Sequence, residues 1–147
     1  MLHHILAGFY ERDLRSVIQE LLLFKDEQNL WKTAGSVRNT SGNLALHLIG
    51  GLNFLIGTQL AHTGYKRNRD QEFIRKDVPR EELVKDLEAV IQLITQTLKS
   101  FDSSRMEADY PIPFDDATRS NSYVLVQLLA HINYHLGQIN YLRRILE

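Results

Sequence analysis

Cysteine is absent from this 147-residue sequence. Without it, the protein has no disulfide bonds, no thiolate nucleophile and no cysteine-ligated zinc. Neither sign of charge dominates, because 17 Lys and Arg residues are balanced by 18 Asp and Glu residues. Sequence-independent binding to nucleic acid needs an excess of basic residues, so we expect no nucleic-acid partner.

The sequence also shows no pattern typical of a signal peptide or of a membrane-spanning segment. The N-terminal apolar residues are soon followed by Glu11, Arg12 and Asp13, whereas a signal peptide starts with basic residues and continues through an uninterrupted apolar segment. No apolar run approaches the roughly 20 residues that span a bilayer. We therefore expect no signal peptide, no membrane contact and a cytoplasmic location, and the lack of cysteine is consistent with a reducing compartment.

What the sequence does contain is helical periodicity. Apolar residues recur at helical spacing in four segments, at about residues 2–27, 42–62 and 79–101 and from TRSNSY at 118–123 to residue 146. The stripes of the first and third segments consist of Leu6, Tyr10, Val17, Leu21 and Phe24, and of Leu83, Leu87, Val90, Ile94, Leu98 and Phe101. No strand pattern competes with them. We expect an all-α, four-helix bundle with long connections, formed by residues 1–147 as a single domain.

Two histidines stand out in the last segment, LLAHINYHLGQINYLRRILE. His131 and His135 are four residues apart, so they share one helix face. Val124 and Leu128 lie on the same face, and we therefore expect both imidazoles to be buried. Each buried imidazole carries a donor and an acceptor that must be satisfied away from water. The pair is either two core histidines bonded to neighbours or two ligands of a divalent cation.

A third ligand is available in the second segment. His47 is followed closely by Gly50 and Gly51, each of which costs about 1 kcal/mol of helix stability relative to Ala. Their position indicates that another group approaches the helix there. His62 is too far along the same helix to join His47 on one metal, and His3 and His4, near the N-terminus, are expected at the surface. The residues alone support a His47, His131 and His135 site and ordinary core histidines about equally.

The layout of these residues resembles the DinB-like superfamily of four-helix-bundle proteins. Its signature is one histidine from helix 2 and an HxxxH pair from helix 4, often followed by GQ, and here Gly137 and Gln138 follow the pair. The resemblance covers essentially the whole chain. It implies that His47, His131 and His135 bind a divalent metal, commonly zinc or nickel, and that homodimers are frequent. Relatives include bacillithiol- and mycothiol-dependent transferases, but the resemblance does not fix a reaction.

Three other polar residues are candidates to orient the ligands. Asn43 lies one turn before His47, and Gln138 follows His135 by three residues, so either amide can reach the outer nitrogen of an imidazole. Asp13 lies on the apolar stripe of the first helix, where it can accept from a ligand histidine or occupy an open metal position. For each of them, a polar residue at the end of the bundle is the competing interpretation.

A second apolar face on the second helix predicts a partner. It consists of Ala45, Ile49, Leu52, Ile56 and Leu60, on the side of the helix opposite His47. One bundle core cannot cover both sides of a helix. The competing explanation is partial cover by a connecting segment, but we expect a homodimer through helix 2 because the face would otherwise be exposed.

Two functions are consistent with these features. The first is a metal-dependent enzyme in which a three-histidine site activates a thiol or water for S-transfer or hydrolysis of a small molecule; three ligands leave a coordination position open, as in catalytic zinc sites. The second is a non-catalytic metal- or ligand-binding bundle. No clear basic patch for an anionic thiol cofactor is present, because the candidates lie in a charge-rich connector that is usually just solvated. These candidates are Lys66, Arg67, Arg69, Arg75 and Lys76.

Overall fold

Four long helices form the body of the protein in a computed structural model that describes all 147 residues. They are α1 (Leu2–Leu23), α2 (Ser41–Leu52), α5 (Arg80–Lys99) and α7 (Asn121–Leu146). Three short helical pieces lie in the connections, namely η1 (Glu27–Trp31), α4 (Arg69–Ile74) and α6 (Ser103–Glu107). No strand is present, so the all-α bundle with long connections is confirmed.

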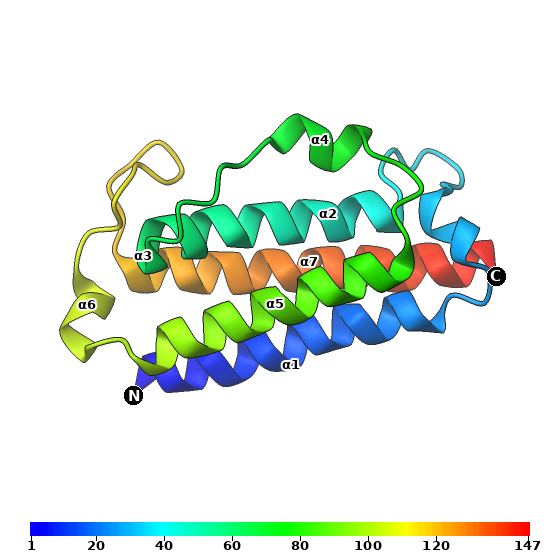
Figure 1. The fold of residues 1–147 in the computed structure, drawn as a ribbon. Coiled ribbons are helices and arrows are strands. Elements are labelled where there is room, and N and C mark those ends of the chain that lie inside the picture. The colour runs from blue at the N-terminus through cyan, green and yellow to red at the C-terminus, as the bar shows by residue number, and fades with distance from the viewer.

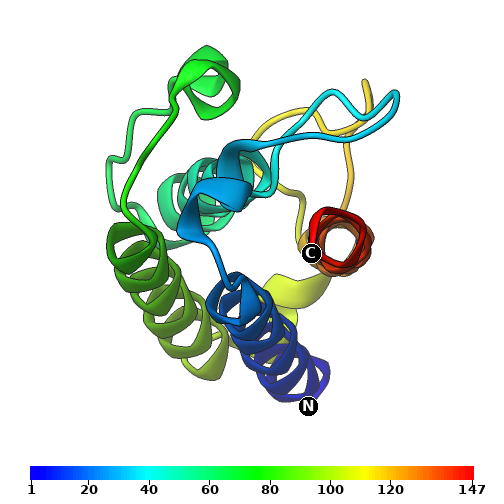
Figure 2. The ribbon, with the colours of Figure 1, turned by 90° about the vertical axis from the view of Figure 1, so that its right-hand side faces the viewer.

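The helices occupy the four corners of the bundle in the end-on view of Figure 2, with α1 diagonal to α2. α1 and α7 run in one direction, while α2 and α5 run in the other (Figure 1). Because α2 and α5 are parallel, the chain must return along the full length of the bundle between them. The segment that makes this return carries α4 and lies over α2.

Local signals account for the helix boundaries. The Thr40 side chain accepts from the backbone N–H of Asn43 at the start of α2, and Ser120 accepts from Tyr123 in the same way at the start of α7. Pro79 precedes α5, whose first turn contains Glu81 and Glu82. The predicted stripes of the first and third segments are confirmed, because every residue in them is buried.

The second predicted helix differs from a regular helix in its second half. α2 is followed by a π-helical stretch, η2 (Asn53–Thr58), and by the short α3 (Gln59–Ala61), which ends at His62 in a left-handed conformation. The stretch Ser41–Ala61 is long and apolar enough, by length and composition, to cross a membrane. The expectation that no such run exists was therefore wrong. However, 61% of its apolar window is buried inside the bundle, as in a core helix, which makes it weak evidence for a membrane span.

The expectation of an exposed apolar face on helix 2 was also wrong. All five of its residues are buried within the single chain. α5 packs along one side of α2 and the segment containing α4 covers another, so every residue of α2 itself is buried. This face therefore gives no reason to expect a dimer. The homodimer stays a prediction.

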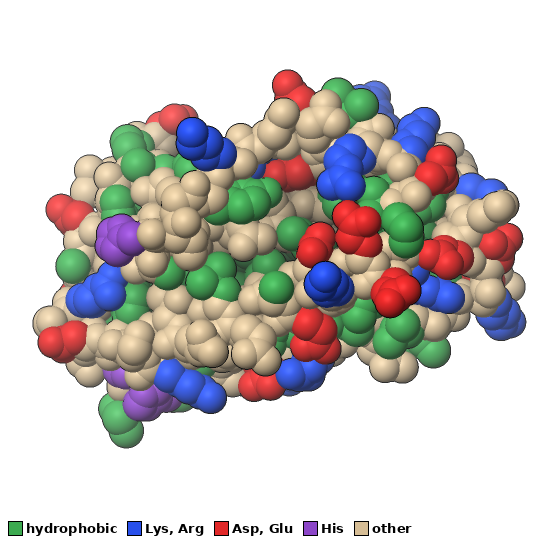
Figure 3. All heavy atoms as spheres, viewed as in Figure 1, with side chains coloured by type: hydrophobic (Ala, Val, Ile, Leu, Met, Phe, Trp, Pro, Cys, Tyr) green, Lys and Arg blue, Asp and Glu red, His purple; other side chains and the backbone are tan.

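Charges on one face of the molecule do not separate by sign. On the face shown in Figure 3, Lys and Arg side chains alternate with Asp and Glu side chains, chiefly around the end of the bundle where α5 begins. This interspersed arrangement agrees with the formal net charge of −1.

Burial of helix 2 by its own chain can be tested at Ile56, which is fully buried. We expect Ile56→Ala to lower the free energy of unfolding by about 2–5 kcal/mol, because it leaves a cavity in the core. Ile145→Ala is the matched control, since Ile145 is 63% exposed, and its effect should stay within about 0.5 kcal/mol. Denaturant unfolding and light scattering measure stability and mass. A change in mass with little change in monomer stability would instead identify Ile56 as an interface residue.

Candidate metal centre

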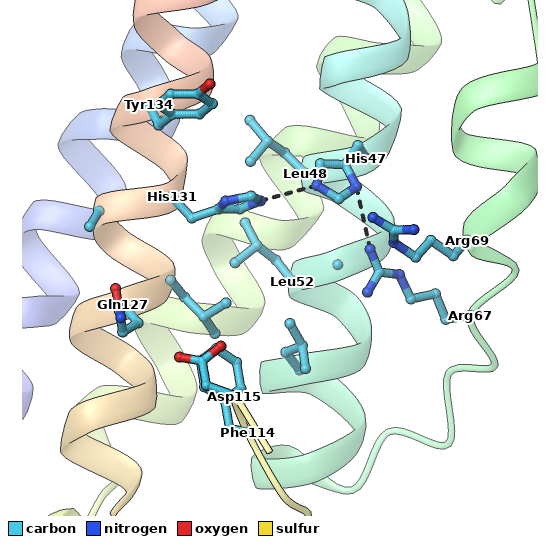
Figure 4. A pocket seen from close by; sticks show the side chains of 14 residues that line it. His47, Leu48, Leu52, Arg67, Arg69, Phe114, Asp115, Gln127, His131 and Tyr134 are labelled. Atoms are coloured by element: carbon cyan, nitrogen blue, oxygen red, sulfur yellow. Dashed lines mark hydrogen bonds between the residues drawn. The ribbon is translucent and has the colours of Figure 1, made fainter. Parts of the chain in front are cut away.

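Three imidazoles meet where α2 packs beside α7. His47 comes from α2, and His131 and His135 come from successive turns of α7. The His131 Nε2 atom lies 3.0 Å from His47 Nε2 and 3.1 Å from His135 Nε2. Their potential ligand atoms all lie within 4.8 Å of one another. Figure 4 shows His47 and His131 pointing toward each other across the space between the two helices.

The outer nitrogens of two of these rings have acceptors. His47 Nδ1 lies 3.0 Å from Glu72 Oε1, and His135 Nδ1 lies 2.7 Å from Gln138 Oε1. An acceptor at Nδ1 fixes the proton there, so that Nε2 of each ring presents a lone pair. The shared space therefore receives a lone pair from His47 and another from His135.

Only His131 can supply a proton between these lone pairs. A neutral imidazole with its proton on Nε2 can donate to one neighbour, and the lone pair of the other ring is then left without a partner. A divalent cation accepts all three Nε2 lone pairs at once, and imidazole nitrogen is a ligand that suits zinc, nickel, copper and iron. The donor set thus fits a metal better than it fits a hydrogen-bonded core.

The surroundings keep the three rings neutral. Loss of hydration, together with the neighbouring His135, His47, Arg67 and Arg69, lowers the pKa of His131 to about 4. Burial is also the main cause that lowers the pKa of His47 and that of His135. The neutral form is the one that binds a metal ion.

Exposure differs within the predicted histidine pair. His135 is buried, as expected, but His131 is exposed. The expectation that both rings are buried was therefore wrong for His131, because its edge lines an open cavity rather than the bundle core. The prediction for His3 was also wrong: this ring is only 5% exposed.

Glu72 is the main residue that sequence reasoning missed. It lies on α4, is 6% exposed, and is bound by Arg67, whose Nε and Nη2 donate to the two carboxylate oxygens at 2.8 and 2.9 Å. Arg67 Nη2 also lies 3.4 Å from His47 Nδ1 (Figure 4). Because the carboxylate contact is shorter and can accept the ring proton, we assign the His47 hydrogen bond to Glu72. The carboxylate fixes the ring and raises its basicity as a ligand.

The paired glycines of α2 make room for these two side chains. A Cβ atom on Gly50 would lie 2.0 Å from Glu72 Oε2, and one on Gly51 would lie 3.3 Å from Arg67 Nη2. The prediction that another group approaches the helix there is confirmed. The glycines were the signal in the sequence that marks the position of Glu72, although they do not identify it.

Of the three residues predicted to orient the histidine ligands, only one contacts a ligand ring. Gln138 contacts His135, as described above. Asn43 contacts the backbone instead: its Nδ2 donates to the carbonyl oxygens of Glu72 and Arg75 at 3.0 and 2.8 Å, and so it anchors α4 over α2. Asp13 is placed elsewhere, where its carboxylate accepts from Arg12 and from Asn133 at 2.7 and 2.6 Å.

A cavity of about 500 Å³ opens beside His47 and His131. Its wall near the histidines carries Arg67 and Arg69, and the Phe114–Ala117 turn contributes Phe114 and Asp115 (Figure 4). The remaining lining residues are Leu48, Gly51, Leu52, Leu55, Gln127, Leu128, Ala130 and Tyr134. A volume of this size is typical of small-molecule sites. A metal held by the three rings would therefore be accessible to a small molecule.

The role of Glu72 can be tested by Glu72→Gln, which keeps an acceptor oxygen but removes the charge. We expect metal affinity to fall by about 10–100-fold, because the carboxylate that supports His47 is lost. Competition with a chromophoric chelator measures this. Glu82→Gln is the control, since Glu82 is an exposed carboxylate whose only ion pair is with Arg75 at 3.6 Å. Equal affinities of the two folded variants would contradict this role.

The close approach at Gly50 gives a second test. Gly50→Ala should displace the Glu72 carboxylate and weaken metal binding in the same direction as Glu72→Gln. Gly137→Ala is the control in α7: nothing lies within 4 Å of its added Cβ, and the substitution should stabilise the protein by about 0.4–1 kcal/mol. Chelator competition and thermal unfolding provide the two readouts. Unchanged metal affinity in the folded Gly50→Ala protein would show that Glu72 can move without consequence.

Comparison with known proteins assigns the chain to a family. The model of a family described as "Protein of unknown function (DUF1572)" matches residues 10–147. No curated protein matches the chain. The matched range includes His47, His131, His135 and Glu72.

Proposed function

Because the chain belongs to the DUF1572 family, whose description names no reaction, we propose a function from the metal centre itself. The protein is a divalent-metal-dependent enzyme of the DinB-like superfamily that carries out S-transfer or hydrolysis on a small molecule. The observation that carries the proposal is the convergence of three Nε2 atoms beside an open cavity. Zinc and nickel are the metals we expect there.

The coordination number supports a catalytic role over a structural one. His47, His131 and His135 are the only members of the potential ligand group, whereas structural zinc sites have four protein ligands. A divalent cation in this position supplies Lewis acidity, which lowers the pKa of a water or thiol and polarises a carbonyl group. A small molecule in the cavity would lie beside two of the three ligands, since His47 and His131 line it.

The protein's own residues have supporting tasks in this proposal. Glu72 and Gln138 hold the rings of His47 and His135 in the tautomer that binds metal. Leu48 and Leu52 give the cavity an apolar wall that limits water beside the reacting group. Asp115 is the only carboxylate in the lining, so it is the available group for accepting a proton from a bound molecule.

A second candidate function has one observation in its favour. Glu72 is the only carboxylate that contacts the three rings, and it is already bound by Arg67. A non-catalytic metal- or ligand-binding protein needs no proton acceptor near the site. The two functions differ in whether a bound metal supports turnover.

Metal analysis of tag-free protein tests the proposal, followed by assays with bimane thioether conjugates and simple esters. We expect about one divalent ion per chain, lost in His131→Ala, and turnover at least 100-fold above that of this variant. His4→Ala is the control, because His4 is exposed and lies outside the cluster. Protein that binds no stoichiometric metal would overturn the proposal. Stoichiometric metal without turnover on either substrate class would favour the non-catalytic function.

A further inference from the structure

The cavity contains two arginines that differ in their partners. Arg67 donates to both oxygens of Glu72, so its charge is neutralised locally. Arg69 lines the same cavity, but it makes no ion pair and no side-chain hydrogen bond within the chain. Its guanidinium is therefore free to bind a group that enters the cavity.

Arg69 is exposed, and its guanidinium contacts an aromatic ring. Its guanidinium lies over the ring of Phe73, 5.4 Å from the centroid. The Phe73 ring in turn lies beside that of His47, with 5.0 Å between their centroids. The stack places a planar cationic donor beside the cavity. Figure 4 shows Arg69 next to Arg67 there, and no hydrogen bond joins Arg69 to the three histidines.

The charge in the cavity favours an anion. The three histidines are neutral ligands, and the charges of Glu72 and Arg67 offset each other. The charges of a divalent cation and of Arg69 would then face the cavity with only Asp115 to oppose them. Low-dielectric walls strengthen such a field, which raises the affinity and association rate of negatively charged molecules.

The rest of the lining defines the body of the ligand. Seven of the 14 lining residues are hydrophobic, among them Leu48, Leu52, Leu55 and Phe114. These side chains offer no hydrogen bonds and so favour an apolar body over a strongly polar one such as a sugar. The lining suits a compact, largely apolar skeleton with an oxyanion at the end nearest Arg69, while Asp115 and Gln127 lie farther from the histidines (Figure 4).

We infer that the cavity binds a small organic anion, whose carboxylate or phosphate oxygens are held by Arg69 while a second donor atom reaches the metal. The guanidinium can bind either oxyanion with two parallel hydrogen bonds. The apolar body of the ligand then packs against the leucines and Phe114. This inference rests on the proposed function, because the second donor needs the metal, and it adds the charge and shape of the substrate.

Two thiols separate the contribution of the oxyanion from that of the metal. The full chain is loaded with Co²⁺ and titrated with 3-mercaptopropionate or with 2-mercaptoethanol, which share a thiol and differ in the carboxylate. The thiolate-to-cobalt absorption band reports binding of both. We expect the wild-type protein to bind 3-mercaptopropionate about 10–100-fold more tightly than 2-mercaptoethanol, because a charge-assisted hydrogen bond contributes about that much affinity.

Variants assign this preference to Arg69. The preference is the ratio of the affinity for 3-mercaptopropionate to that for 2-mercaptoethanol. In Arg69→Ala this ratio should fall to near unity, while the affinity for 2-mercaptoethanol stays within about twofold of the wild-type value. Arg69→Lys should retain part of the preference. Arg75→Ala is the matched control, because Arg75 is an exposed arginine of the same connection outside this cavity. Asp115→Asn should raise the affinity for 3-mercaptopropionate, since it removes the opposing charge. Comparing the preference between variants cancels the intrinsic difference between the thiols.

The outcomes distinguish the two proposals. A cobalt spectrum with equal preference in wild type and Arg69→Ala overturns the inference and leaves the metal centre intact. Failure to bind any of Co²⁺, Zn²⁺ and Ni²⁺ overturns the proposed function, and the inference with it. Loss of the preference in Arg75→Ala to the same extent would also overturn the inference, because a general surface charge would then explain the effect.

Discussion

The site depends on a shortage of protons among three imidazoles. Two Nε2 lone pairs converge on a third ring that can donate to only one of them. Leaving a buried acceptor unpaired costs about 1–3 kcal/mol, so a bundle that packed for stability alone would gain by replacing these rings with leucines. The arrangement becomes favourable when a cation takes all three lone pairs. The contacts from Glu72 and Gln138 support this arrangement, because they fix the protons of His47 and His135 on the outer nitrogens.

The direction of the helices explains where those supporting contacts come from. Because α2 and α5 are parallel, the segment between them must run back along the bundle, and it passes over the face of α2 that carries Gly50 and Gly51. A short hairpin could not bring Glu72 to His47. Asn43 completes the arrangement by binding the backbone of that returning segment. The long connection is thus part of the site as well as a requirement of the topology.

Helical periodicity predicted the long helices and their buried faces. It predicted little about the connections between them. The buried stripes of α1 and α5 and the shared face of His131 and His135 follow directly from helical geometry. α4 has six residues and no apolar period, so nothing in its sequence indicated that Glu72 would be buried. The second face of helix 2 was misread for a related reason: a helix that is apolar all round is equally consistent with complete burial in its own chain. His131 is exposed because a cavity interrupts the core beside it, which a helical wheel cannot show.

Arg67 and Arg69 lie in the same connection but have different roles in the two proposals. Arg67 supports a metal ligand, and Arg69 would bind the small anion. Arg67 binds Glu72 and lies close to His47, so changes in it would reach the metal through the carboxylate. Arg69 makes no hydrogen bond or ion pair with that network, and its guanidinium lies over the ring of Phe73 instead. Metal affinity and selection of the bound molecule would therefore depend on different side chains only two residues apart. Such a separation allows substitutions at Arg69 and around the cavity to change which small anion binds while the three-histidine centre and its support remain unchanged.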